Sequence, residues 1–219
     1  MQLDVFTQVP SAFAWLCEQR PLATVLGSEL ELRLFNYRDT TPLRAGEVDD
    51  EPYGGGAGLV LRVDVVAAAL DAVYGGAPQQ HRVVALTPQG RQLTQEVVEE
   101  LAVEDRLTLL SSRSEGFDER IVAHLASDAI SIGPYVLSGG ELPALVLLDA
   151  LARRLPGAIR AESGALESFS GELAGGFEYP QYTRPAEFRG WPVPEVLLSG
   201  DHARIEEWRR EQSRARSVR

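Results

Sequence analysis

A glycine-rich turn in the second half of the chain is best suited to holding a small molecule. The stretch 131–144 reads SIGPYVLSGGELPA and leads directly into the apolar segment 145–152. Its glycines allow backbone angles that side chains forbid, and they let main-chain groups approach a ligand closely. Glu141 and Pro143 suit the first turn of a helix, where backbone N–H groups attract polar groups. The pattern predicts a loop that binds a polar small molecule, although an ordinary strand–loop–helix turn has the same composition.

A second candidate for chemistry is the acidic segment 49–58, which reads DDEPYGGGAG. Adjacent carboxylates before a glycine run could hold a metal ion or a ribose, and they are also typical of a plain loop. Cys17 is the single cysteine, which excludes a cysteine-built zinc site and an intramolecular disulfide. The three histidines lie far apart, and there is neither a P-loop nor a dinucleotide fingerprint. We therefore predict no metal centre.

The elements that must position these residues alternate along the first 150 residues. The apolar patterns predict strands at 3–6, 30–35, 82–86, 107–110 and 130–132. They predict helices at 12–18, 63–73, 94–102, 120–126 and 145–152. Thr94 is the expected N-terminal cap of the helix at 94–102. The segment 37–58 reads as a long loop, which is typical of a functional region. Strands that alternate with helices imply an α/β fold with a mostly parallel sheet covered on both faces.

The chain then changes character. Residues 157–178 lose periodicity and are rich in glycine, which predicts a flexible linker. Residues 179–219 read as a small, mainly helical piece whose main helix, 205–214, is highly charged. The expected organisation is therefore a domain at 1–156, a linker at 157–178 and a C-terminal piece at 179–219.

Composition restricts the partners. No apolar run approaches 18 residues and no signal-like segment begins the chain, so we expect a cytoplasmic protein without membrane contact. The net charge is −11 and lysine is absent, which disfavours general polyanion binding and DNA in particular. Arginines gather near the C-terminus, where they suit either RNA contact or a solvated helix: Arg204, Arg209, Arg210, Arg214, Arg216 and Arg219.

Five collinear stretches resemble the bacterial tRNA (guanine-N(1)-)-methyltransferases of the TrmD type, which belong to the SPOUT superfamily. They are residues 48–58, 87–91, 131–144, 179–185 and 193–202, and the resemblance extends from Leu3 to about Ser213. It implies a SPOUT-type mostly parallel sheet with a deep C-terminal trefoil knot, S-adenosyl-L-methionine as cofactor, and a homodimer that modifies tRNA. Relatives of this type continue for several more helices, so the helical C-terminal piece is expected to be shortened.

The resemblance further implies that the cofactor lies among three loops, 86–90, 111–116 and 132–140. Backbone amides and carbonyls of these loops would hold its adenine. The matched residues are Leu86, Thr87, Pro88, Gln89, Gly90, Ser112, Arg113, Glu115, Gly116, Ile132, Gly133, Pro134, Tyr135, Val136, Leu137, Ser138, Gly139 and Gly140.

Three residues match catalytic positions of the family. Glu167 stands in a Glu-Ser-Phe triplet where relatives carry Asp-Ser-Phe, and this carboxylate would accept the proton of the target ring nitrogen. Arg153 matches an arginine proposed to polarise the guanine carbonyl oxygen. Glu115 matches a glutamate linked to the base or to Mg²⁺, and the resemblance leaves the need for Mg²⁺ open. Without the family resemblance, Glu167 would be interpreted as an ordinary linker glutamate and Arg153 as a surface arginine.

Several positions depart from the family pattern at this site. Ser112 replaces a glycine that lies against the cofactor, and Ser114 replaces a tyrosine. Pro134 replaces an aspartate and removes one amide donor. The extra methylene of Glu167 moves its carboxylate by about 1.5 Å relative to aspartate. A histidine that relatives carry upstream is absent from 40–46.

Three functions are therefore open. The leading one is S-adenosylmethionine-dependent methylation of a ring nitrogen in the guanosine 3′ of the tRNA anticodon, in active sites shared between the subunits of a homodimer. The shortened tail and the charge of −11 favour a second, in which a small nucleoside-like metabolite or another RNA is the acceptor. The departures favour a third, a non-catalytic knotted dimer.

Overall fold

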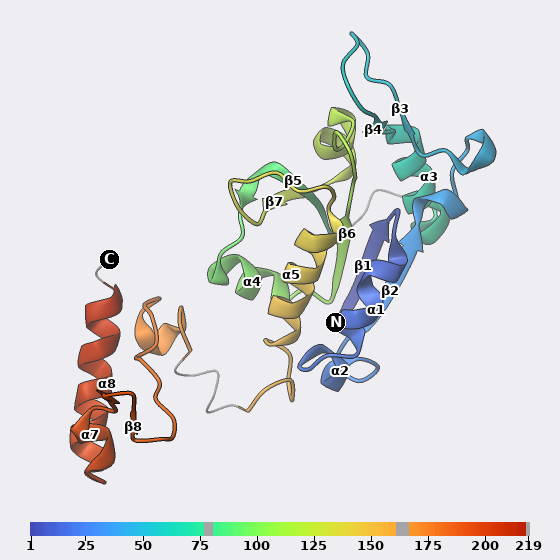
Figure 1. The fold of residues 1–219 in the computed structure, drawn as a ribbon. Helices are drawn as coiled ribbons and strands as arrows, with labels where there is room; N and C mark the ends of the chain where they lie inside the picture. Colours follow the sequence, from blue (N-terminus) through green and yellow to red (C-terminus); the bar gives the residue numbers. More distant parts are fainter. Residues whose placement is uncertain (77–80, 161–166, 218–219) are drawn as a thin grey trace. The chain divides into compact units, whose positions relative to one another are not determined.

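The computed structural model describes residues 1–76, 81–160 and 167–217 of the chain (Figure 1). The chain forms two compact units, Met1–Ala158 and Ile159–Arg219. Each unit has its own internal contacts and is described by itself below, as unit 1 and unit 2. The expected division into 1–156, 157–178 and 179–219 stays a prediction, and residues 161–166 of that linker lie outside the described residues.

Unit 1 is built on a five-stranded sheet in which every pair of neighbouring strands is parallel. The strand order is β2-β1-β6-β5-β7. The strands are β1 (Gln2–Thr7), β2 (Glu31–Asn36), β5 (Arg82–Gln92), β6 (Arg106–Leu110) and β7 (Asp128–Ser131). The parallel sheet inferred from alternating strands and helices is confirmed.

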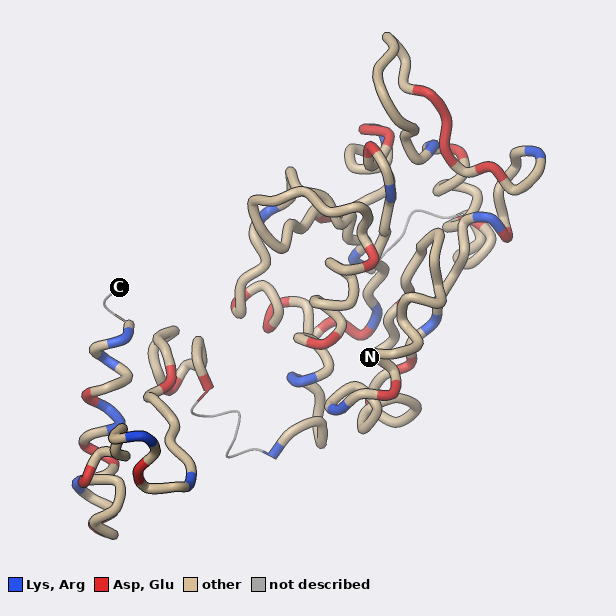
Figure 2. Tube along the Cα trace, in the orientation of Figure 1, with Lys and Arg blue, Asp and Glu red and all other residues tan. Residues whose placement is uncertain are grey.

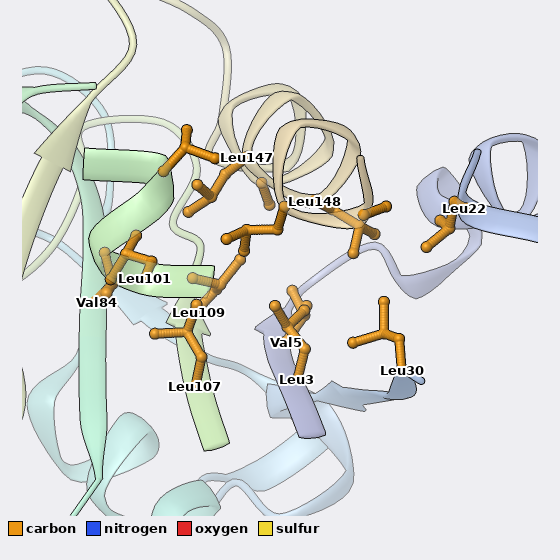
Figure 3. Close-up of a cluster of buried hydrophobic side chains, with 14 of the residues drawn as sticks. Leu3, Val5, Leu22, Leu30, Val84, Leu101, Leu107, Leu109, Leu147 and Leu148 are labelled. Carbon is orange, nitrogen blue, oxygen red and sulfur yellow. The ribbon is translucent and has the colours of Figure 1, made fainter. Parts of the chain in front are cut away.

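Helices cover both faces of this sheet. Leu3 and Val5 point to one face, where they pack with side chains of α4 (Gln95–Ala102) and α5 (Glu141–Ala152). Figure 3 shows Leu147 and Leu148 of α5 lying over Val5 and Leu109. The short helices α1 (Ala14–Cys17) and α2 (Leu22–Val25) cover the same face. On the opposite face a second core surrounds α3 (Val63–Tyr74).

Two of the predicted helices have a different form. The segment 12–18 is a 3₁₀ turn, Pro10–Phe13, followed by the single turn of α1. The segment 120–126 is a π-helical turn, Ile121–Leu125, because the amide of Ala126 bonds to the carbonyl of Ile121 at 2.9 Å. The predicted cap of α4 is confirmed, since the Thr94 side chain accepts a hydrogen bond from the amide of Val97 at 3.4 Å.

Strand β5 departs most from the sequence-based expectation. The predicted strand ends at residue 86, with a loop at 86–90, whereas β5 continues to Gln92. Leu86 and Arg91 both pair with Ile130, so residues 87–90 form a bulge between two paired portions. Arg91 holds the second portion by hydrogen bonds to Glu100 and Asp128. The loop at 86–90 is thus a bulge within a strand.

The predicted loop 37–58 contains a short strand and two 3₁₀ turns. Strand β3 (Asp49–Asp50) pairs antiparallel with β4 (Val60–Leu61). The 3₁₀ turns Tyr37–Asp39 and Arg44–Gly46 precede this ribbon. The segment between β3 and β4 stands away from the sheet (Figure 1).

Unit 2 consists of a small hairpin and helices. Strands β8 (Glu187–Phe188) and β9 (Trp191–Pro192) form the hairpin, and α7 (Glu195–Leu198) and α8 (His202–Ser217) follow it. Ser213 and Ser217 tie α8 to the backbone of Phe177 at 2.6 and 2.9 Å. Figure 2 shows arginines and acidic residues interspersed along α8. Among the helices that the structure describes, none is long and apolar enough to cross a membrane.

Candidate functional site

A cavity of about 560 Å³ lies where the segments after β6 and β7 meet the bulge of β5. Such a volume suits a small-molecule ligand, and parallel sheets bind ligands at the carboxyl ends of their strands. The cavity is lined by Leu86, Thr87, Pro88, Gln89, Ser112, Arg113, Ser114, Glu115, Gly116, Phe117, Glu119, Val122, Ala129, Ile130, Ser131, Ile132, Gly133, Tyr135, Val136, Leu137, Gly139, Gly140 and Pro143.

The residues matched to a cofactor site converge on this one cavity, apart from Gly90, Pro134 and Ser138. Gly90 faces β7 instead, because a Cβ added there would lie 2.4 Å from the amide nitrogen of Ile130. Pro134 and Ser138 are exposed. The assignment of all the matched residues to a cofactor site remains a prediction.

Sequence reasoning missed five residues that line the cavity, whereas Ser131 and Pro143 fall within the predicted binding stretch 131–144. The missed residues are Phe117, Glu119, Val122, Ala129 and Ile130. Ala129 and Ile130 belong to β7, and Ser131 ends it. Phe117, Glu119 and Val122 follow the segment 111–116, and Pro143 lies in the first turn of α5. Their proximity in sequence to the matched loops was the available signal. Which of them face the cavity depends on how β7 and the π-helical turn pack, which no local pattern specifies.

Backbone contacts join two of the loops around the cavity. The amide of Gly140 donates to the carbonyl of Ser112 at 2.7 Å, and the hydroxyl of Ser111 donates to the carbonyl of Gly140 at 3.2 Å. Arg113 and Gly139 form an isolated antiparallel bridge. A Cβ added at Gly140 would lie 2.8 Å from the Cα of Ser111, so only glycine allows this approach. The segments 111–116 and 132–140 therefore form one continuous wall.

The acidic ribbon, which is residues 49–61 with strands β3 and β4, contacts the cavity residue Glu115 near Gly58. The amide of Glu115 donates to the carbonyl of Leu59 at 3.1 Å, and a Cβ added at Gly58 would lie 2.4 Å from the Glu115 carboxylate. Asp50, by contrast, pairs with Arg62 at 3.0 Å. Within residues 1–76, 81–160 and 167–217, no group of three acidic, histidine or cysteine side chains is arranged to hold a metal ion. The described ribbon therefore lends no support to a metal site at 49–58.

The three residues matched to catalytic positions occupy different places. Glu115 lines the cavity and is exposed. Arg153 follows the last residue of α5, whereas Gly140 at the other end of this helix lines the cavity. The twelve residues of α5 span about 18 Å, so Arg153 and Gly140 lie at opposite ends of this helix. Glu167 belongs to unit 2, where its carbonyl accepts a hydrogen bond from the amide of Ser170 at 3.1 Å.

Comparisons with known proteins identify relatives along the whole chain. The family model described as tRNA (Guanine-1)-methyltransferase TrmD matches residues 1–219. The chain is similar to the tRNA (guanine-N(1)-)-methyltransferase of Brevibacillus brevis, with 45% identity over 99% of this chain and 88% of the relative. It shares 47% identity with the enzyme of that name from Gloeobacter violaceus, over 99% of this chain and 95% of the relative. The corresponding protein of Dehalococcoides mccartyi is 44% identical, over 100% of this chain and 88% of the relative.

Proposed function

The chain belongs to the tRNA (guanine-1)-methyltransferase TrmD family, and we propose on this basis that it methylates a ring nitrogen of guanosine in tRNA. The methyl donor is S-adenosyl-L-methionine, and the target is the guanosine 3′ of the anticodon. The observation that carries the proposal is the convergence of the matched loops on a single cavity. Identity of 45% along nearly the whole chain favours this function over a small nucleoside acceptor or a non-catalytic dimer.

The residues around the cavity fit this cofactor. Glycines 133, 139 and 140 line the cavity and bring the main chain close to it, and backbone amides and carbonyls are the groups that read an adenine edge. Leu86, Ile132 and Leu137 supply apolar surface for the adenine ring. When bound, S-adenosylmethionine supplies an electrophilic methyl group. The protein has to hold the donor, orient the acceptor and accept one proton.

Each polar residue matched by the family takes one of these tasks. When the ring nitrogen receives the methyl group and the donor leaves as a neutral thioether, the Glu167 carboxylate would accept the proton that this nitrogen loses. The charge that develops on the guanine oxygen is stabilised by the Arg153 guanidinium. Glu115, exposed at the cavity, orients the base through its carboxylate or through a bound Mg²⁺ ion.

The proposal includes a homodimer in the cytoplasm. Arg153 stands at the far end of α5 from the cavity, and Glu167 belongs to unit 2. A second copy would supply Glu167, its linker and its C-terminal piece to a cavity of the first. We further propose that the segments 86–90, 111–116 and 132–140 form the deep trefoil knot of the family. The close contact of Gly140 with Ser111 supports such a crossing of the chain.

Two measurements test the proposed function. Calorimetry with S-adenosylmethionine should show micromolar binding with one site per subunit or per dimer. Transfer of a labelled methyl group should then occur to tRNA with guanosine after the anticodon, and not to tRNA with adenosine there.

Glu167→Ala should lower the transfer rate on the order of a hundredfold without abolishing cofactor binding. Absence of binding at millimolar cofactor would refute the proposal, and an unchanged rate in Glu167→Ala would refute the role of Glu167. Assays with and without a chelator settle the need for Mg²⁺.

A further inference from the structure

Glu141 is a buried carboxylate directly behind the cavity wall. It is the first residue of α5 and is only 6% exposed. Its Oε1 accepts a hydrogen bond at 2.9 Å from the hydroxyl of Thr7, the fully buried last residue of β1. Thr7 in turn accepts a hydrogen bond from the amide of Val9 at 3.0 Å. Burying a carboxylate raises the free energy of the folded protein unless the charge has hydrogen-bond or ion-pair partners. The partners of Glu141 therefore indicate what the residue does.

The second oxygen of Glu141 faces Arg113. Its Oε2 lies 3.7 Å from the guanidinium of Arg113, which lines the cavity and whose side chain is 39% exposed. Gly139 makes this approach possible, because a Cβ there would lie 2.5 Å from Oε2 and 3.1 Å from Cγ of Arg113. Glu141 itself is not among the lining residues. The Glu141 carboxylate therefore lies behind the cavity wall, whereas Arg113, which it attracts, is part of that wall.

The other groups near Glu141 do not compete for this interaction. Tyr37 is fully buried, and burial raises the pKa of its hydroxyl well above the ordinary value, with a further rise from the charge of Glu141. Tyr37 therefore stays neutral. The N-terminus of α5 also favours a negative charge at its first residue. Among the described residues, the ion-pair partner of Glu141 is Arg113.

We propose that Glu141 is a positioning residue that acts through Arg113. Together with Thr7, it holds the segment 112–116 in the conformation that receives the cofactor, and it does not touch the cofactor. This inference rests on the proposed function, because it assigns S-adenosylmethionine to the cavity. Its physical basis is preorganisation, since a wall that is already fixed loses less entropy when the ligand binds.

A double-mutant cycle on cofactor binding tests whether Glu141 works through Arg113. Glu141→Gln keeps an oxygen for Thr7 and removes the charge, and it should weaken binding of S-adenosylmethionine on the order of tenfold by calorimetry, within the range of coupled neighbours. In an Arg113→Met background the same substitution should change the affinity by less than about twofold. Equal losses in both backgrounds, or no loss in either, would overturn the proposal.

A second readout needs no cofactor. Glu141→Gln should accelerate amide hydrogen exchange in a peptide spanning 112–116, whereas Glu99→Gln should not. Glu99→Gln is a matched control, because it removes a Glu–Arg pair between two exposed residues, Glu99 with Arg154 at 3.3 Å. If Glu141→Gln does not fold, Thr7→Val and Thr7→Ser replace it, and only Thr7→Ser should restore slow exchange. Unchanged exchange in Glu141→Gln refutes the inference, as does unchanged exchange in Thr7→Val where that variant replaces it. Wild-type protein that fails to bind the cofactor refutes the proposed function alone.

Discussion

At the scale of single residues, the buried carboxylate of Asp4 needs partners that offset the free energy lost when a charge leaves water. Asp4 is fully buried in β1 and receives two hydrogen bonds of 2.7 Å from Arg33 and one of 2.6 Å from Tyr74. Burial opposes its ionisation, but these hydrogen bonds outweigh burial, so the pKa of Asp4 lies below its usual value. His81 joins the same network through Thr108 at 2.8 Å. Burial and the nearby Arg106 lower the pKa of His81.

These two shifts predict that acid destabilises the protein. The folded pKa of Asp4 lies below its unfolded value near 3.9, so its contribution is complete above that pH and is lost as the pH falls toward the folded pKa. Neutral His81 acts in the same direction below about pH 6.5, because the unfolded chain binds the proton more readily. Urea midpoints should therefore decrease steadily from pH 7 to pH 3.

Asp4→Asn separates the two groups. This variant should be less stable at pH 7, because Arg33 loses the charge of its partner, and its urea midpoint should vary less below pH 4 than that of the wild type. The dependence between pH 6.5 and pH 5 should persist, since His81 is unchanged. An Asp4→Asn variant with the same slope as the wild type below pH 4 would show that Asp4 is not the titrating group.

At the scale of elements, the bulge of β5 forms one part of the cavity wall. Residues 87–90 leave the ladder, and pairing with β7 resumes at Arg91. Arg82 and Arg91 both contact Glu100 of α4 and Asp128 of β7, so the two paired portions share one set of ion pairs. Thr87, Pro88 and Gln89 can therefore line the cavity from within a strand.

Gly90 is the position in this element where a side chain is least tolerated. A Cβ there would lie 2.4 to 2.6 Å from backbone atoms of Ala129 and Ile130, which cannot move without shifting β7. Gly90→Ala should lower the free energy of unfolding by about 1–3 kcal/mol, as overpacking does, and should weaken cofactor binding. Gly171→Ala is the control, because nothing lies within 4 Å of its added Cβ, and it should change stability by less than about 0.5 kcal/mol. Equal stability of the two variants in urea titrations would contradict the assignment of the bulge.

At the scale of the whole molecule, acidic charge is divided unequally between the two units. Unit 1 contains 12 arginines and 22 acidic residues, and unit 2 contains 9 arginines and 10 acidic residues. The net charge of −11 is therefore concentrated on the unit that holds the cavity. Unit 2, which includes the arginines of α8, would repel an RNA backbone much less than unit 1. A negative total charge is thus compatible with a tRNA substrate.

The proposed shared active sites predict complementation between two impaired variants, because Glu115 lines the cavity of one chain and Glu167 would come from the second copy. Glu115→Ala and Glu167→Ala should each transfer methyl groups much more slowly as homodimers. After the two proteins are unfolded together and refolded, half of the dimers should be mixed, and each mixed dimer should have one intact site. Methyl transfer should then recover to about a quarter of the wild-type rate, as expected for random pairing in a two-fold dimer. No recovery despite mixed dimers would mean that Glu115 and Glu167 act within one chain. The control is the same procedure with each variant alone.

The sequence by itself determined the family, the parallel sheet and the loops that meet at the cavity. These features depend on local patterns, such as apolar strand segments, the Thr94 cap and the glycines of 131–144, and on motif order. Tertiary structure alone decided the continuation of β5 through its bulge, because that depends on pairing with β7. It alone decided the role open to Glu141, whose partner Thr7 lies 134 positions away in the chain. Burial and pairing arise from contacts between distant segments, and the spacing of residues along the chain does not encode them locally.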